Sequence, residues 1–331
     1  MLNKEEFEFL GITQWHKAGY KGQGITICSK ENIIEGIFDD VFCLEYEEQD
    51  KWSEHGTTVM DYIRQVAPKA EKWAIETEGT IKNGVLYSEG MDYLQENVPD
   101  ILTTSFFKDS DVKEPKKSLY KKLYDKGCFL CCASGNNDRD TLQPLTNGDM
   151  WKAIGACRYN NGNPQVEKSY VDGEEMDFVS FHRLIATWDN DMHKGTSFSA
   201  PLFTGMIALV QCLFLKKTGK KLNHENLEKF VIDNCIDLEE KGHDNKTGRG
   251  LFILPNPETI NTKKYVEDYM EKKIVLKIDS NIARVNGVEK GLDAPATILN
   301  NRTMVPVRFI AEELDCKVTW DEEDRTVIIE K

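Results

Sequence analysis

Three polar side chains that could perform acyl transfer stand where apolar segments of the sequence meet their loops. Ser197 lies in KGTSFSAPLFTGMIALV, at the mouth of a predicted buried helix. His55 lies in EHGTTVMDYI at the entrance of a predicted amphipathic helix, and Asn136 follows the apolar strand of CFLCCASGNN. Acyl transfer by a serine needs a hydroxyl, a base, a donor to the oxyanion and a group that orients the base. Each residue also has a purely structural interpretation: Ser197 as a helix N-cap, His55 as a structural histidine with its hydrogen bonds satisfied, and Asn136 as a turn residue.

The elements that must position these side chains alternate between helices and strands. Residues 7–20 are predicted to form a helix, and a Gly turn then leads into an apolar strand at 25–29. A further strand is predicted from about residue 100, followed by a basic amphipathic helix over 116–127 and a cysteine-rich strand over 128–133. This alternation predicts βαβ units and therefore an α/β fold, with a parallel sheet covered by helices on both faces.

The phrases HGTTV, ASGN and GTSFSAP, in this order, resemble the signatures of the subtilisin-like serine proteases. The resemblance implies a subtilisin-like fold and an endopeptidase that cuts a peptide or protein substrate through an acyl-enzyme on Ser197. It further implies that His55 is the general base and then the general acid, and that Asn136 donates its amide to the oxyanion. No cofactor is implied.

The group that orients the base departs from the pattern of this family. The family has an aspartate at the end of the first strand, where the phrase ICSKE of this chain places Ser29. Neutralising this acid costs about 10⁴ in turnover in such triads, and Lys30 beside it would disfavour a protonated imidazole. A Ser29 hydroxyl could accept from the imidazole and hold the ring weakly. Carboxylates that could substitute are Glu31, Glu54, Asp39 and Asp40.

The strand that would pair with substrate departs as well. Where the family has glycines, this chain has Ser105, Phe106 and Phe107. Phe107 would narrow the cleft or form an apolar subsite, unless it packs into the core. The VAP phrase at 66–68 follows His55 closely, so we expect no calcium-binding loop there.

The C-terminal part is predicted to be a separate small α+β domain. We place the peptidase domain at 1–256, a polar connector at 257–272 and the small domain at 273–331. The phrase RTMVPVRFIAEEL resembles the stalk domain named after the N-terminal region of copper amine oxidases. Residues 271–331 contain no histidine, which argues against copper binding and favours a spacer or a module that contacts a protein or a cell surface.

Composition limits the partners and the compartment. A formal charge of −14 argues against nucleic acid or an anionic membrane, and no stretch reaches the about 18 apolar residues of a membrane span. The N-terminus lacks a secretory pattern, and the nine cysteines read as reduced, buried hydrophobic residues. A cytoplasmic location follows, with release or surface association suggested by the stalk module. A metal site is not expected, because strand alternation separates Cys131 from Cys132.

Two hypotheses about function remain open. The first is a serine endopeptidase with an atypical triad. The second is a pseudopeptidase of the same fold, which has lost turnover together with the aspartate and keeps its cleft for binding a protein partner.

Overall fold

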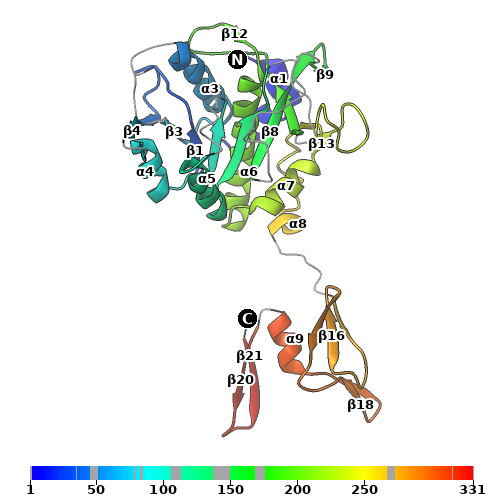
Figure 1. Cartoon of the computed structure of the whole chain (residues 1–331). Coiled ribbons are helices and arrows are strands. Elements are labelled where there is room, and N and C mark those ends of the chain that lie inside the picture. Colours follow the sequence, from blue (N-terminus) through cyan, green and yellow to red (C-terminus); the bar gives the residue numbers. More distant parts are fainter. Residues whose placement is uncertain are drawn as a thin grey trace. The chain divides into compact units, whose positions relative to one another are not determined.

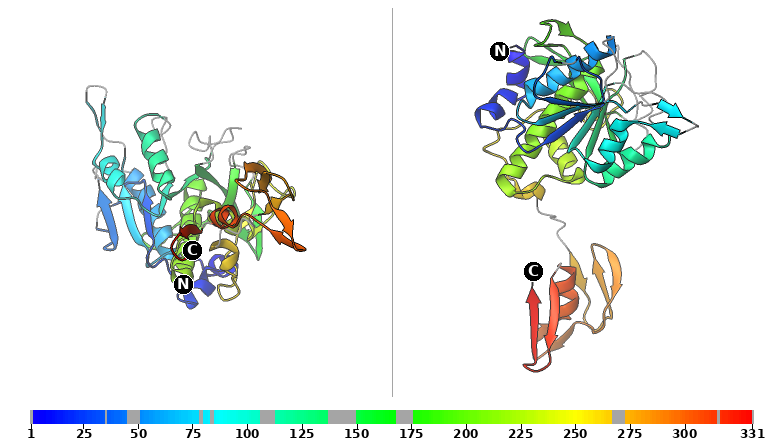
Figure 2. Two further views of the ribbon diagram at one scale, coloured as in Figure 1. Left: turned by 90° about the horizontal axis from the view of Figure 1, so that it is seen from below. Right: turned by 90° about the vertical axis from the view of Figure 1, so that its left-hand side faces the viewer.

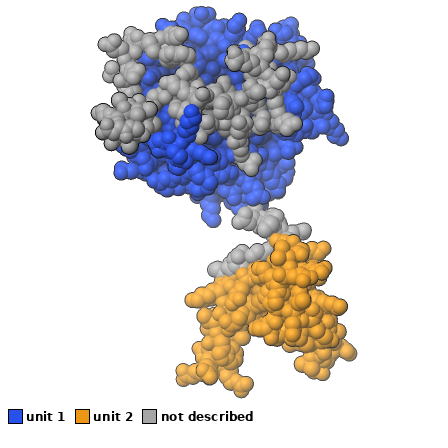
Figure 3. Space-filling view, in the orientation of Figure 1, with its two compact units in different colours: residues 1–266 blue, residues 267–331 orange. Residues whose placement is uncertain are grey.

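The structure is a computed structural model that describes residues 2–34, 36–44, 51–77, 80–82, 85–105, 113–136, 150–167, 176–266, 273–314 and 316–330. The chain divides into two compact units, unit 1 (residues 1–266) and unit 2 (residues 267–331), which Figure 3 colours separately. Each unit is described by itself.

Unit 1 is built on one large sheet with the strand order β13-β14-β10-β8-β7-β6-β1-β3-β2 (Figure 1). Neighbouring strands from β14 to β2 pair in parallel, whereas β13 and β9 are antiparallel additions to β14 and β8. The strands of unit 1 are β1 Thr26–Ser29, β2 Val41–Leu44, β3 Glu71–Ile75, β4 Thr80–Lys82, β5 Val85–Tyr87, β6 Ile101–Thr104, β7 Phe129–Ala133, β8 Trp151–Asn160, β9 Asn163–Val166, β10 Met176–Phe181, β11 Leu184–Ile185, β12 Met192–His193, β13 Cys235–Ile236 and β14 Leu251–Phe252.

Helices cover both faces of this sheet (Figure 2), as the sequence predicted. The helices of unit 1 are α1 Lys4–Phe9, α2 Ile12–Lys17, α3 Lys51–Val66, α4 Glu89–Glu96, α5 Lys116–Asp125, α6 Thr196–Thr218, α7 His224–Ile232 and α8 Lys263–Val266. The larger apolar cluster joins the sheet to α1, α2, α3, α6 and α7, and a second cluster joins the other face to α4 and α5. Cys131 belongs to the first cluster and Cys132 to the second, which confirms that they point to opposite faces.

The centre of the larger core is α6. Its first nineteen residues, from Thr196 to Phe214, are all buried, as expected for a helix that is apolar all round. Among the described residues α6 is the one helix long and apolar enough to cross a membrane, but 94% of its apolar window is buried inside the protein. At Gly205 a Cβ would lie 2.6 Å from the Cβ of Val66, so the missing side chain lets α3 pack closely against α6.

The N-terminal helix expected over 7–20 is in fact two short helices, α1 and α2. Gly11 separates them with a φ of 80°, and a Cβ there would lie 2.3 Å from the carbonyl oxygen of Leu254. Trp15 of α2 is buried and donates its indole N–H to the carbonyl of Pro255 at 2.6 Å. The break at Gly11 thus allows both helices to pack against the segment that follows β14.

None of the nine cysteines, all of which lie in the described residues, forms a disulfide. Six of them are buried, and burial raises the pKa of the Cys131 thiol to about 11. These thiols therefore act as small apolar core residues, as the sequence indicated.

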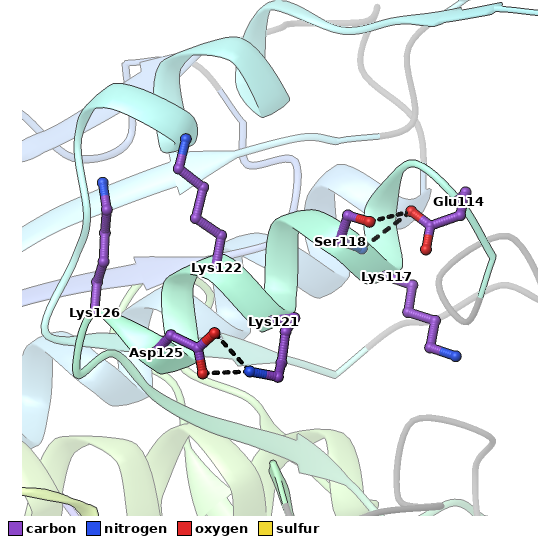
Figure 4. A pocket seen from close by; sticks show the side chains of 7 residues that line it. All are labelled: Glu114, Lys117, Ser118, Lys121, Lys122, Asp125 and Lys126. Atoms are coloured by element: carbon purple, nitrogen blue, oxygen red, sulfur yellow. Dashed lines mark hydrogen bonds and ion pairs between the residues drawn. The ribbon is translucent and has the colours of Figure 1, made fainter.

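The basic helix α5 confirms the predicted segment and presents a charged outer face (Figure 4). Lys121 pairs with Asp125, and Ser118 donates its hydroxyl to Glu114. Lys117, Lys122 and Lys126 line the same shallow hollow. Because this hollow follows the surface of a single helix, it reads as a solvated face and not as a binding site.

Unit 2 consists of small antiparallel sheets and one helix, in agreement with the predicted α+β domain. Its buried apolar residues are few and mostly small, including Ala283, Ala296 and Ala311, while Ile298 and Trp320 are 62% and 51% exposed. Its elements are β15 Ile274–Leu276, β16 Ile282–Val285, β17 Val288–Gly291, β18 Thr297–Leu299, β19 Arg302–Met304, α9 Val307–Glu313, β20 Lys317–Asp321 and β21 Thr326–Glu330.

Candidate active site

Three loops that carry candidate site residues leave the sheet at the same edge. The strands β7, β6 and β1 are parallel neighbours, so their carboxyl ends lie side by side. Glu31 follows β1, Ser105 follows β6 and Asn136 follows β7. In open parallel sheets this edge is where ligands bind.

Ser197 is the second residue of α6 and faces this edge. Gly195 is the N-cap of the helix, with a φ of 134° that a residue with a side chain rarely adopts. Ser197 is 7% exposed, and its hydroxyl donates to the carbonyl oxygen of Ser105 at 3.3 Å. The Ser105 hydroxyl donates in return to the carbonyl of Ser197 at 2.6 Å. The N-terminus of α6 favours negative charge at this point.

His55 lies in α3 and is paired with Glu31. Its Nδ1 is 3.4 Å from Glu31 Oε2, and the two side chains are 21% and 5% exposed. Gly56 allows this approach, since a Cβ there would lie 1.9 Å from the carbonyl oxygen of Asn32 and 2.9 Å from the Cβ of Glu31. The absence of a side chain at Gly56 thus lets the segment after β1 lie against α3.

The pair shifts the titration of His55. Burial lowers the pKa of the imidazole, but the hydrogen bond and the charge of Glu31 raise it, and the net pKa is above its ordinary value of 6.5. The pKa of His55 therefore moves in the direction opposite to the one expected from Lys30. Lys30 itself is a buried side chain, and its backbone N–H donates to the carbonyl of Thr103 at 2.9 Å.

The second oxygen of Glu31 connects the acid to the serine. Glu31 Oε1 accepts the backbone N–H of Ser105 at 2.8 Å, and Ser105 also exchanges hydrogen bonds with Ser197. The ring of His55 lies 5.5 Å from the ring of Phe198, centroid to centroid, and Phe198 directly follows Ser197. The structure thus gathers an imidazole, a carboxylate and a serine hydroxyl in one small network.

Asn136 is tied to the residue before the serine. Its Oδ1 accepts the backbone N–H of Thr196 at 2.8 Å and the Thr196 hydroxyl at 2.9 Å. The Thr196 hydroxyl in turn accepts the N–H of Gly135 at 3.1 Å. With its oxygen held in this way, the amide nitrogen of Asn136 is the part available to donate to a ligand.

Ser29 does not hold the imidazole in this structure. It is the last residue of β1, fully buried, and its hydroxyl has no hydrogen-bond partner among the described residues. Of the other carboxylates suggested by the sequence, Asp40 pairs with Arg64 at 2.8 Å and Lys72 at 3.1 Å. Asp39 and Glu54 are exposed. Glu31 is the candidate that reaches His55.

Of the three residues predicted to bind substrate, one is described. Ser105 lies between the acid and the serine, whereas Phe106 and Phe107 fall outside the described residues. Two further residues, Thr196, which bonds Asn136, and His182, which accepts the N–H of Gly195, were missed from the sequence. Thr196 is visible as the middle residue of the GTS phrase, but nothing in the sequence marks His182. Among the described residues no group of three or more histidines, cysteines and carboxylates is arranged to hold a metal ion.

A fold of this kind, with a serine at the entrance of the central helix and a histidine–carboxylate pair beside it, defines a class of serine hydrolase. A family model described as the subtilase family matches residues 45–250, more than half of the chain. The chain belongs to the subtilase family. A second model, described as the copper amine oxidase N-terminal domain, matches residues 259–329.

Similar proteins support the same assignment. The major intracellular serine protease of Bacillus subtilis (strain 168) is 24% identical over 212 residues, which cover 61% of this chain and 65% of that relative. The chain thus matches slightly less than two thirds of the length of this relative. The crystal structure of a lanthipeptide protease has a TM-score of 0.58 at 14% identity and covers 76% of this chain and 94% of its own. Fervidolysin from Fervidobacterium pennivorans, a keratinolytic enzyme related to subtilisin, has a TM-score of 0.57 at 17% identity. The match covers 75% of this chain and 44% of the fervidolysin chain. These structures show that the fold is subtilisin-like.

Proposed function

We propose that this chain is a serine endopeptidase in which Ser197 is the nucleophile, His55 the general base and Glu31 the acid that orients it. The observation that carries the proposal is the carboxylate of Glu31, which lies 3.4 Å from His55 Nδ1 and accepts the N–H of Ser105. A carboxylate in that place holds the ring orientation and stabilises the imidazolium that forms during acyl transfer.

The proposed reaction uses these groups in sequence. His55 Nε2 removes the proton of the Ser197 hydroxyl as the oxygen attacks the peptide carbonyl, and the imidazolium is stabilised by Glu31. The amide nitrogen of Asn136 and the N-terminus of α6 stabilise the oxyanion. The imidazolium then protonates the leaving amine, and a water activated by His55 hydrolyses the acyl-enzyme.

The hydrogen bond from the Ser197 hydroxyl to the carbonyl of Ser105 is present in the free enzyme. Catalytic hydrogen bonds in a free enzyme are often formed only when substrate binds. In the proposed reaction the Ser197 hydroxyl leaves the carbonyl of Ser105 by rotation about its Cα–Cβ bond. The carbonyl of Ser105 is then available to the backbone of an extended peptide, which β-strand addition would place along the end of β6.

We further propose a role and a setting for the rest of the chain. Residues 257–272 would connect the peptidase domain, 1–256, to the small domain, 273–331, which would serve as a spacer or as a contact to a protein or cell surface. The free, buried cysteines fit a reducing compartment such as the cytoplasm. A relative named as an intracellular serine protease agrees with this.

A serine-directed fluorophosphonate probe tests the proposed function. The wild-type chain should gain one probe mass on Ser197, measured by intact mass and peptide mapping, and Ser197→Ala and His55→Ala should not. His193→Ala is the matched control, because His193 also lies 5.5 Å from the Phe198 ring but pairs with Asp189. Absence of label on folded wild-type protein from mildly acidic to alkaline pH would refute the peptidase and leave the pseudopeptidase hypothesis.

A further inference from the structure

We propose that His182 is a positioning residue that fixes the backbone of the loop carrying Ser197, an inference that rests on the proposed peptidase function. His182 directly follows β10, and its side chain is fully buried. Its Nδ1 accepts the backbone N–H of Gly195 at 3.0 Å. Gly195 is the N-cap of α6 and lies two residues before Ser197.

The N–H of Gly195 needs such an acceptor. Gly195 is buried, and a buried N–H without a partner is unfavourable. The next N–H along the chain, that of Thr196, is taken by Asn136. Two successive N–H groups are therefore bound by side chains from the ends of two different strands, β10 and β7, and these bonds set the direction in which the chain enters Ser197.

The other side of the His182 ring is fixed as well. Because Nδ1 accepts a hydrogen bond, the ring proton resides on Nε2, which lies 3.2 Å from Glu167 Oε2. Arg183 donates to the same carboxylate through Nη2 at 3.2 Å, whereas its Nε, 3.3 Å from His182 Nε2, faces a nitrogen that carries a proton in this tautomer and does not bond it. The backbone N–H of His182 donates to the carbonyl of Cys157 at 3.2 Å. The imidazole is thus a rigid acceptor, held from behind by its neighbours.

The surroundings also keep this ring neutral. Burial lowers the pKa of His182 to about 4, with Glu167 opposing the shift and Arg183 and Arg158 adding to it. At neutral pH the Nδ1 lone pair is therefore available to Gly195. Glu167 does not reach Ser197 by any contact of the described residues, so its part is to hold the ring.

Two substitutions separate this role from simple packing. In His182→Asn the side-chain oxygen sits close to the position of Nδ1, so the acceptor for Gly195 is retained. In His182→Gln the amide reaches toward Glu167, and the acceptor at Nδ1 is lost. His224→Gln is the matched control, because His224 is a partly buried histidine of α7 that bonds the carbonyl of Tyr124, far along the chain from Ser197.

The readouts are amide hydrogen exchange and kinetics on the full chain. We expect His182→Gln to speed exchange in the peptide covering Gly195–Ser197 by about 10-fold or more and to lower kcat by about 10-fold to 100-fold. KM should change little, because the substrate contacts remain. His182→Asn should restore both quantities to near wild type, and His224→Gln should leave both unchanged.

The outcomes separate this inference from the proposed function. Unchanged exchange at Gly195–Ser197 in folded His182→Gln would overturn the positioning role, and so would a full loss of kcat in folded His182→Asn. If His182→Gln does not fold, the kcat and exchange of His182→Asn decide the question. If the wild-type chain is not labelled by the fluorophosphonate probe but amide exchange at Gly195–Ser197 is still faster in His182→Gln, the peptidase proposal fails. The positioning of Gly195 by His182 is then still supported.

Discussion

Replacement of Glu31 by glutamine tests the central feature of the site. The substitution keeps the size of the side chain and an oxygen that can accept the N–H of Ser105, but it removes the negative charge beside His55. If Glu31 is the acid of the triad, Glu31→Gln should lower kcat/KM strongly while the protein remains folded. Glu54→Gln is the matched control, since Glu54 is the exposed carboxylate directly before His55.

The size of the effect follows from the geometry. Both side chains are largely buried and 3.4 Å apart. With an effective dielectric constant of about 20, unit charges at that distance attract by about 5 kcal/mol. This attraction is present when the imidazolium forms, and about 1.4 kcal/mol corresponds to a tenfold change in rate. We therefore expect a loss of about 10³-fold to 10⁴-fold, similar to the about 10⁴-fold loss on neutralising the acid of other serine triads.

The pH profile gives a second, independent reading. His55 must be neutral to accept the proton of Ser197, so the acid limb of kcat/KM reports its pKa. Glu31 raises that pKa above 6.5, and Glu31→Gln should therefore move the acid limb to lower pH as the plateau falls. The ion pair also contributes to the free energy of unfolding. Because folding raises the pKa of His55, this contribution is full below the pKa of His55 in the unfolded chain and is lost as the pH rises through its pKa in the folded protein.

The assay is hydrolysis of a peptide ester or amide across the pH range, with thermal unfolding as the control for folding. A loss of less than about tenfold in folded Glu31→Gln, with the acid limb unmoved, would refute the role of Glu31. In that case the acid would have to be sought elsewhere, and a large rise in kcat/KM in Ser29→Asp would identify the end of β1 as its place.

Three other predictions follow from neighbouring contacts. Ser29→Ala should leave kcat/KM close to that of the wild type and change the free energy of unfolding by no more than about 0.5 kcal/mol, because the buried hydroxyl has no partner among the described residues. A large loss in the hydrolysis assay would mean that Ser29 does hold His55. Ser29→Asp should not raise the rate and should lower the thermal midpoint, since it adds a buried carboxylate. Gly56→Ala should abolish probe labelling and destabilise the protein, because the new Cβ would lie 1.9 Å from the carbonyl of Asn32 and displace the segment that carries Glu31; normal labelling of this variant would contradict that account. Gly155→Ala is the matched control, because a Cβ there would meet only side-chain atoms among its three nearest neighbours, those of Met176 at 2.9 Å and 3.1 Å and of Val179 at 3.1 Å.

Much of the fold could be predicted from the sequence because its signals are local. Strands β1, β6 and β7 are short apolar runs bounded by glycines or charged residues, and α6 is an uninterrupted apolar helix. The break between α1 and α2 was missed, since the need for Gly11 arises from the carbonyl of Leu254, which is remote in sequence. Contacts of this kind leave no periodic pattern.

In the candidate site, too, local sequence signals could be recognised, whereas features that depend on contacts in space could not. Ser197, His55 and Asn136 could be proposed from the sequence because each lies in a short phrase at the end of a predicted element. Ser29 was placed at the position of the family's aspartate by alignment along the strand, which presumes that the chain after β1 keeps the family's path. The position of Glu31 depends on how residues 30–32 lie against Gly56. The sequence offered Glu31 as one of four carboxylates, and it could not rank them without that path.

The two contacts of Glu31, a hydrogen bond from the Ser105 N–H and an ion pair with His55, support the proposal that an acid displaced along the chain serves the same imidazole. A carboxylate at the end of a strand is oriented by the strand itself, whereas Glu31 lies in a loop and has a longer side chain with more rotational freedom. Its orientation is supplied by the N–H of Ser105, which binds one oxygen and leaves the other toward His55. Ser105 belongs to the end of β6 and also bonds Ser197, so in the proposed site the same residue would align the acid and the nucleophile. Under this proposal a pair of residues, Glu31 and Ser105, takes the place of one strand-borne aspartate, and loss of either should disturb the imidazole.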